Sequence, residues 1–165
     1  MPSLFFLVLL VVVGLLVFAL WRIVDAANAA DPAHRTMEPG MIWLLLIPIF
    51  QIYWNFRSLP AVSESLTATL RDKGLKSSDC GRAIGRVWAL LVLAINVLHV
   101  IAWTAEGLFM SIGADGLASL EMTLVGLVVM LAWLAVFGCI IVYVVQVQAA
   151  KSQIVAAEHQ TGSQG

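Results

Sequence analysis

Residues 122–145 read MTLVGLVVMLAWLAVFGCIIVYVV, a run of 24 residues without a charged side chain. As an α-helix this run is about 36 Å long, which is enough to cross the hydrocarbon core of a bilayer, roughly 30 Å thick, with some tilt. Only helices and closed barrels satisfy all their backbone polar groups in lipid. An uncharged run of this length therefore predicts a membrane-spanning helix and an all-α fold.

The composition of the whole chain supports this prediction. Of 165 residues, 61% are hydrophobic and only 12% are charged, and the mean hydropathy is +0.96. Soluble domains contain about 25% charged residues. The net charge is −1, so nothing in the charge balance favours nucleic acid as a partner. We expect one integral membrane domain over residues 1–158, with the lipid bilayer as its main partner, and a flexible tail at 159–165.

Three further apolar runs precede this one. Residues 4–20 carry no charged side chain and end at Trp21-Arg22, an aromatic residue and a cation at the expected membrane boundary. A cleaved signal peptide is the alternative, but no basic residue precedes the run. The other two runs are residues 41–56 and 87–103. The expected helices are about 3–24, 41–57, 60–73, 82–104 and 121–148.

Run 41–56 leaves the topology open, because it is short and contains Pro48. If it crosses the membrane, the bundle has four transmembrane helices. If it is instead a re-entrant hairpin at 41–56, three transmembrane helices remain and all nine Lys and Arg lie on one side. In both cases the positive-inside rule places loop 57–86 and the C-terminus in the cytoplasm, and the loop 104–121, which has no basic residue, outside.

In residues 60–73 the apolar side chains recur with helical spacing, so a helix here would have one apolar face and one polar face. Val62, Leu66 and Leu70 recur every four residues, and polar side chains occupy the positions between them. This pattern predicts one amphipathic helix at the membrane interface.

Polar side chains inside the apolar runs are the candidate site residues. Asn96 and His99 share a face of the third run, and Gln51 and Asn55 share a face of the second. Polar groups in lipid need partners, so we expect interhelical contacts between these two pairs. His99 is the weak candidate for a cofactor ligand. No second intramembrane histidine is available to complete a haem site, so no cofactor is expected.

Other expected roles are structural. Interfacial anchoring is expected for five tryptophans and two arginines near the ends of the runs: Trp21, Trp43, Trp54, Arg82, Arg86, Trp88 and Trp103. Cys80 and Cys139 are expected to be free thiols, and neither belongs to a spacing typical of metal sites. No nucleophile motif is present, so neither a metal site nor a catalytic site is predicted and the chain is not expected to be an enzyme.

The segment 38–56, EPGMIWLLLIPIFQIYWNF, carries a family resemblance. Its Pro-Gly-x-x-Trp-Leu start, Ile-Pro-x-Phe core and Trp-x-Phe exit are similar to those of small bacterial polytopic membrane proteins of uncharacterised function. The similarity covers roughly residues 35–85. It implies a protein of the bacterial inner membrane and assigns no site residues.

Two functions are compatible with these patterns. The first is a non-catalytic structural or accessory subunit that packs against other membrane subunits or itself, with helix 4–20 at the edge of the bundle as the docking surface. The second is a small oligomeric transporter or channel, with a polar path near Gln51, Asn55, Asn96 and His99. Ion paths usually need several ionisable groups, and His99 is nearly alone, so the first function is favoured.

Overall fold

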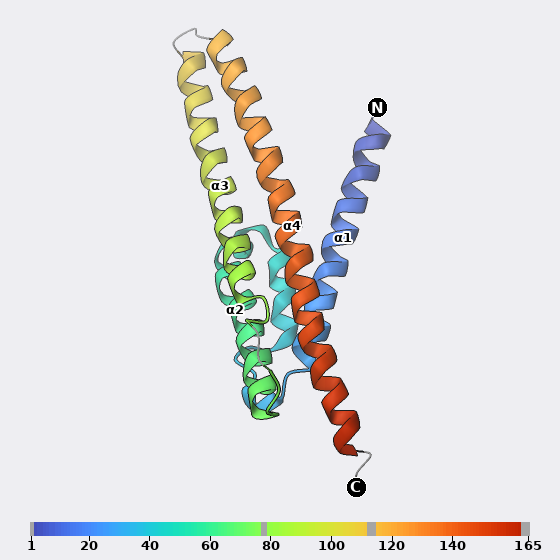
Figure 1. Ribbon diagram of the computed structural model, residues 1–165. Coiled ribbons are helices and arrows are strands. Elements are labelled where there is room, and N and C mark those ends of the chain that lie inside the picture. The colour runs from blue at the N-terminus through green and yellow to red at the C-terminus, as the bar shows by residue number, and fades with distance from the viewer. Residues whose placement is uncertain (1, 77–78, 112–114, 163–165) are drawn as a thin grey trace.

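The computed structural model describes residues 2–76, 79–111 and 115–162, and nearly all of them are helical (Figure 1). The elements in chain order are α1 (Pro2–Asn28), the 3₁₀ helices η1 (Pro32–His34) and η2 (Pro39–Leu46), α2 (Pro48–Asp72), α3 (Arg82–Ser111) and α4 (Asp115–Gly162). The predicted all-α class is confirmed.

The helices pack together at one end of the molecule, and α1 separates from the others toward the opposite end. α1 descends in the view of Figure 1, η2 rises beside it, α2 descends again, α3 rises, and α4 returns beside α3 and continues beyond the start of α3. The start of α1 and the α3–α4 connection therefore lie at the same end. Above their lower halves, α1 and α4 diverge.

Three helices are long and apolar enough to cross a membrane. They lie at Leu9–Asn28, Arg82–Ser111 and Glu121–Gln160 within the described residues. The expected fourth span at 41–57 is not confirmed. The run is divided at Ile47, whose backbone is extended with φ −90° and ψ 113° between η2 and α2. The break has a local cause, because the ring of Pro48 disfavours helical geometry in the residue before it.

The amphipathic segment 60–73, which was expected to be a separate helix, is part of α2. Pro60 lies inside α2 without ending it. Val62, Leu66 and Leu70, the expected apolar face, are buried, but so are polar side chains between them, including Ser63. α2 is consequently an inner member of the bundle over residues 58–70, and the expected separate interfacial helix at 60–73 is not confirmed.

The expected loop 104–121 is mostly helical. α3 continues to Ser111 and α4 begins at Asp115, so only residues 112–114, which lie outside the described residues, connect them. Glycine costs a helix only about 1 kcal/mol and the segment has no proline, so nothing in it stops the helices. At its other end α4 passes 148 and includes 159–162 of the expected flexible tail, for a length of about 72 Å.

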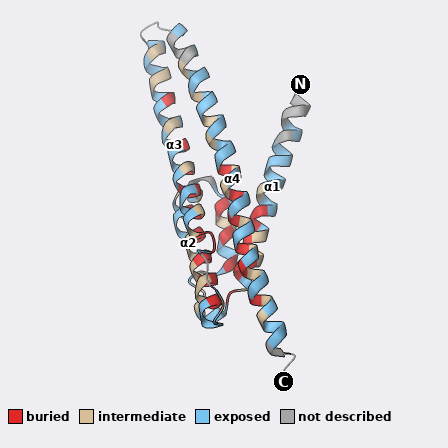
Figure 2. Cartoon of the chain, in the orientation of Figure 1, coloured by how far each residue is buried: buried red, intermediate tan, exposed pale blue. Residues whose placement is uncertain are grey.

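The core occupies the lower half of the bundle (Figure 2). Its fully buried large side chains come from every α-helix and η2, and include Leu20, Ile42, Leu66, Val92 and Val147. By contrast, the described side chains of α1 from Phe6 to Phe18 are exposed, apart from the half-buried Leu16. The prediction that the first helix lies at the edge of the bundle is confirmed for these residues.

The hairpin of η2 and α2 is held by one tryptophan. The indole N–H of Trp54 donates a 2.8 Å hydrogen bond to the carbonyl of Met41, which joins the two arms. Below the hairpin, Arg35 donates to the carbonyls of Ala30 and Asn28. These bonds satisfy the carbonyl of the last residue of α1 and one carbonyl just beyond the helix.

Candidate functional site

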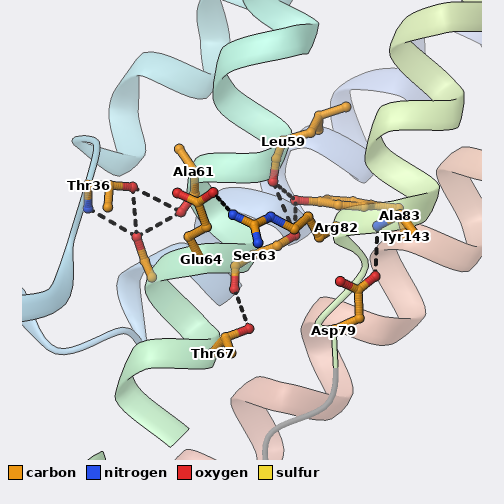
Figure 3. Close-up of polar contacts among 11 residues, drawn as sticks. Thr36, Leu59, Ala61, Ser63, Glu64, Thr67, Asp79, Arg82, Ala83 and Tyr143 are labelled. Carbon is orange, nitrogen blue, oxygen red and sulfur yellow. Dashed lines mark hydrogen bonds and ion pairs between the residues drawn. The ribbon is translucent and has the colours of Figure 1, made fainter. Parts of the chain in front are cut away.

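The most concentrated polar contacts of the described chain surround Tyr143, where α2, α3 and α4 meet (Figure 3). The Tyr143 side chain is 0% exposed. Its hydroxyl donates a 2.7 Å hydrogen bond to the carbonyl of Leu59 and lies 3.3 Å from the hydroxyl of Ser63. Trp88 packs edge-on against its ring, with centroids 6.1 Å apart. We call this group the Tyr143 junction.

Two glycines let α3 approach the Tyr143 ring. A Cβ on Gly81 would lie 2.9 Å from Cδ2 of Tyr143, and one on Gly85 would lie 3.0 Å from Cβ of Leu59 and 3.1 Å from Cε2 of Tyr143. Gly81 also has φ +87°, which favours glycine. The start of α3 therefore depends on both the absent side chain and the backbone freedom of Gly81.

Hydroxyl side chains line the opposite side of α2. Ser65 and Thr69 each donate to the carbonyl four residues before them, at 2.8 and 2.9 Å. The same oxygens accept hydrogen bonds from the connector between α1 and η2, residues 29–38. The Ser65 oxygen accepts from the N–H of Thr36, and the Thr69 oxygen accepts from the N–H of Asp31. Small hydroxyls thus satisfy connector N–H groups while allowing close packing.

Charged groups close the lower end of the junction. Arg82 is ion-paired with Glu64, which ties α3 to α2. Asp79 accepts a 2.7 Å hydrogen bond from the N–H of Ala83 and so caps the first turn of α3. Because Arg82 sits next to Gly81, the ion pair and the glycine contact position the same turn.

A second charged group ties α1 to α4. Lys151 lies 2.6 Å from the carboxylate of Asp25, and the Gln148 side chain donates to the carbonyl of Arg22. Arg22 itself lies 3.9 Å from Asp25. These contacts fix the direction in which the apolar part of α1 leaves the core.

The predicted polar contacts between α2 and α3 do not form. Asn96 donates to the carbonyl of Val92 at 2.7 Å, and Nδ1 of His99 lies 2.9 Å from the carbonyl of Ile95, so each bonds its own helix. Both side chains are exposed on α3. The prediction that they bond Gln51 or Asn55 is wrong. Carbonyls four residues back are always within reach on a helix, so no tertiary partner was needed.

Asn55 has the opposite environment. Its side chain is 0% exposed, and neither the amide nitrogen nor the amide oxygen has a hydrogen-bond partner among the described residues. Burying an unpaired amide costs roughly 1–3 kcal/mol on the evidence of protein mutations. Gln51, one turn earlier, is half-buried.

The expected anchors divide into three groups. Trp103 is 75% exposed and Trp21 is 51% exposed, as an anchor at a lipid boundary requires. Trp43 and Trp54 are half-buried. The expectation for Trp88 is wrong: it is 2% exposed, because it packs in the core against Tyr143.

The two arginines expected to be anchors also differ in their surroundings. Arg86 is exposed, whereas Arg82 is half-buried and ion-paired with Glu64. The ion pair gives Arg82 a role within the bundle as well as at its surface.

The Tyr143 junction as a whole was not predicted from the sequence. One signal was available, because Tyr143 is a phenol inside an uncharged run, and a buried tyrosine hydroxyl usually finds a hydrogen-bond partner. The glycines and serines that complete the junction are common residue types, and only their positions in space distinguish them. Asp79, Gly81 and Gly85 belong to the turn before α3 and its first residues.

The junction has the chemistry of a packing site. The hydroxyls of Tyr143 and Ser63 both donate to the backbone carbonyl of Leu59. Cys80 is buried, Cys139 is half-buried, and neither forms a disulfide, as predicted. Within residues 2–76, 79–111 and 115–162, no three His, Cys, Asp or Glu side chains come together as a metal site would require.

Comparison with known proteins finds no matching family model, no similar curated protein and no similar solved structure. The resemblance carried by residues 38–56 therefore stays a prediction.

The first prediction concerns Gly81. Gly81→Ala should lower the free energy of unfolding by about 1–3 kcal/mol, because the new Cβ meets the Tyr143 ring and the backbone keeps a positive φ. Gly126→Ala is the matched control, since nothing lies within 4 Å of the Cβ position there. Unfolding in mixed micelles, followed by tryptophan fluorescence, measures both. Equal stability of the two variants would contradict the tight contact.

The second prediction concerns Asn55. Asn55→Leu should raise the free energy of unfolding by about 1–3 kcal/mol, because it replaces an unpaired buried amide with an apolar side chain of similar size. Asn96→Leu is the control for a general gain in hydrophobicity, since Asn96 is exposed and bonds its own helix. The same unfolding measurement applies. A loss of stability in Asn55→Leu alone would show that the amide has a partner, such as an internal water molecule.

Proposed function

We propose that this chain is a non-catalytic, multi-pass protein of the bacterial inner membrane that serves as a structural or accessory subunit. The observation that carries the proposal is the position of α1. Its apolar half leaves the bundle above Ala19, and side chains such as Leu10, 71% exposed, face no other part of the described chain (Figure 2). α3 and α4, in contrast, lie along each other.

A lipid-exposed helix needs no protein partner, because acyl chains contact apolar side chains as well as protein does. The support for docking is the fixed direction of α1. Lys151 and Gln148 hold its lower end through Asp25 and Arg22, and Leu20 and Ile23 are buried in the core. A helix projected at a set angle away from its neighbour presents a preformed surface to a membrane partner.

The orientation follows from charge. All nine Lys and Arg belong to segments toward the end where α1 and α2 finish and α3 starts, and residues 87–150 contain none. The opposite end carries Glu106 and Glu121. By the positive-inside rule, loop 57–86 and the C-terminus face the cytoplasm, whereas the α3–α4 connection and the N-terminus face outward.

The alternative of a transporter or channel has less support. Asn96 and His99 lie on the outer surface of α3, so they line no polar path inside a single chain. A path between subunits would need a second copy to cover them.

The third prediction tests this orientation. In a chain with Cys80→Ala and Cys139→Ala, single cysteines are introduced as Lys76→Cys, Gly116→Cys and Ser3→Cys. An impermeant thiol reagent should label the first only in inverted vesicles and the other two only in right-side-out vesicles. Labelling of position 3 from the same side as position 76 would instead indicate four spans. Labelling of position 116 from the same side as position 76 would contradict the proposed topology.

The fourth prediction tests docking by α1. Replacing Phe6, Leu10 and Phe18 together with Ala should release the protein from its complex in mild detergent, because docked apolar side chains lose protein contacts. Val100→Ala with Ile101→Ala is the matched control on an equally exposed face of α3. The measurement is the mass of the purified assembly by light scattering and mass spectrometry. A complex that survives the α1 substitutions, or a wild-type chain that is purely monomeric, would refute the docking role.

A further inference from the structure

A cavity of about 640 Å³ opens beside the η2–α2 hairpin and is not part of the Tyr143 junction. Its walls include Glu38, Met41, Trp54, Phe56 and Arg57. In Figure 3, Thr36 and Ala61, which also line it, lie on the side of α2 away from Tyr143. The volume falls in the range of about 300–1,000 Å³ that is typical of small-molecule sites.

Two opposite charges face this cavity without a partner. Glu38 and Arg57 are both exposed, and neither forms an ion pair or side-chain hydrogen bond with any described residue, including the other. A third charged residue on the wall, Glu64, is already paired with Arg82. The cavity therefore offers one open cation and one open anion, which suits a ligand that carries both charges.

The depth of the cavity points to a lipid ligand. Ile52, near the tip of the hairpin, shares a surface groove with Asn96 of α3, so the tip reaches about the middle of that helix. Lower down, Gly85 of α3 lies against Leu59 of α2, since a Cβ on Gly85 would be 3.0 Å from Cβ of Leu59. Arg57 lies two residues from Leu59 and Arg86 lies one residue from Gly85, both toward the tip, which is about 3 Å and about 1.5 Å along the two helices. Arg57 is thus level with Arg86, at the expected headgroup layer.

Apolar side chains surround the mouth of the cavity on the side toward the tip. Met41 and Phe56 line it and are 42% and 40% exposed, and Leu46 and Phe50 are exposed nearer the tip. A ligand held at Glu38 would therefore meet apolar surface that continues toward the membrane interior. This arrangement matches a molecule with a charged head and acyl chains.

We propose that this cavity binds the headgroup of a zwitterionic phospholipid with a primary amine, such as phosphatidylethanolamine. The Arg57 guanidinium donates to the phosphate in the paired geometry that arginine favours, and the ammonium group donates to the Glu38 carboxylate. Met41 and Phe56 contact the glycerol and the first acyl carbons. This site goes beyond the subunit role, and it requires no partner protein.

The fifth prediction concerns which phospholipid the protein binds and how that binding depends on Glu38 and Arg57. The full-length protein in detergent is given equal amounts of phosphatidylethanolamine and phosphatidylglycerol with the same acyl chains, and bound lipid is counted by native mass spectrometry. Wild-type protein should prefer phosphatidylethanolamine by about threefold to fivefold, the size expected for a partly exposed ion pair. Glu38→Gln should abolish the preference, and Arg57→Gln should weaken the binding of both lipids. Arg86→Gln, at the same depth outside the cavity, is the control and should change neither.

Several results would overturn the site. One is equal binding of the two lipids by wild-type protein, a comparison that needs no variant. Another is an unchanged preference in Glu38→Gln when its thermal midpoint matches that of wild type. Phosphatidylcholine, which has no N–H to donate to Glu38, should bind less well than phosphatidylethanolamine, and equal binding would refute the amine contact. Full displacement of the lipid by an equal concentration of soluble glycerophosphoethanolamine would assign the cavity to a soluble zwitterion. A failure of α1 docking would leave all these ratios unchanged.

Discussion

The hydroxyl of Tyr143 is enclosed by protein, where neither water nor another chain can satisfy it. Its bond to the Leu59 carbonyl therefore constrains the depth at which α4 passes α2. The ring then fills the space that Gly81 and Gly85 leave open, and this contact determines where α3 can begin. The contacts of Tyr143 therefore set how far α2, α3 and α4 are shifted along one another. The rest of the lower core packs around it, and the helices that leave the core are oriented by it.

A second constraint comes from Pro48. A continuous helix over residues 41–72 would carry charged side chains such as Arg57 and Glu64 far along its length, so it could not lie wholly in lipid. The break at Ile47 instead turns the chain back on itself, and Trp54 joins the arms of the hairpin. Leu46 and Ile47 at the turn are exposed, as are Phe50 and Tyr53, whereas Ile42, Leu45 and Asn55 face the bundle and are buried. Burial against protein is the condition under which non-spanning backbone is tolerated at membrane depth.

These two constraints give the proposed functions their geometry. Because the core lies at one end, α1 extends from it with few contacts to the rest of the chain, and a partner helix or acyl chains can lie against its upper half. Because the hairpin stops partway along α3, it leaves a cavity near the headgroup layer, where Glu38 and Arg57 remain unpaired. Docking and lipid binding would then use different parts of the molecule, one above the core and one beside it.

Hydropathy alone determined the all-α class, three of the four expected spans and the edge position of α1, because the cost of charge and unpaired backbone in lipid is large and local. The tertiary structure decided the rest. The sequence left a span or a hairpin open for run 41–56, and the run forms both arms of a hairpin, because Pro48 breaks the helix, η2 packs against α1, and α2 packs against α3 and α4. Asn96 and His99 bonded their own helix, while the unpaired amide of Asn55 was buried. Hydrogen-bond partners depend on the rotation of each helix about its axis, and that rotation is set by contacts such as those of Tyr143, which arise only when distant segments pack together.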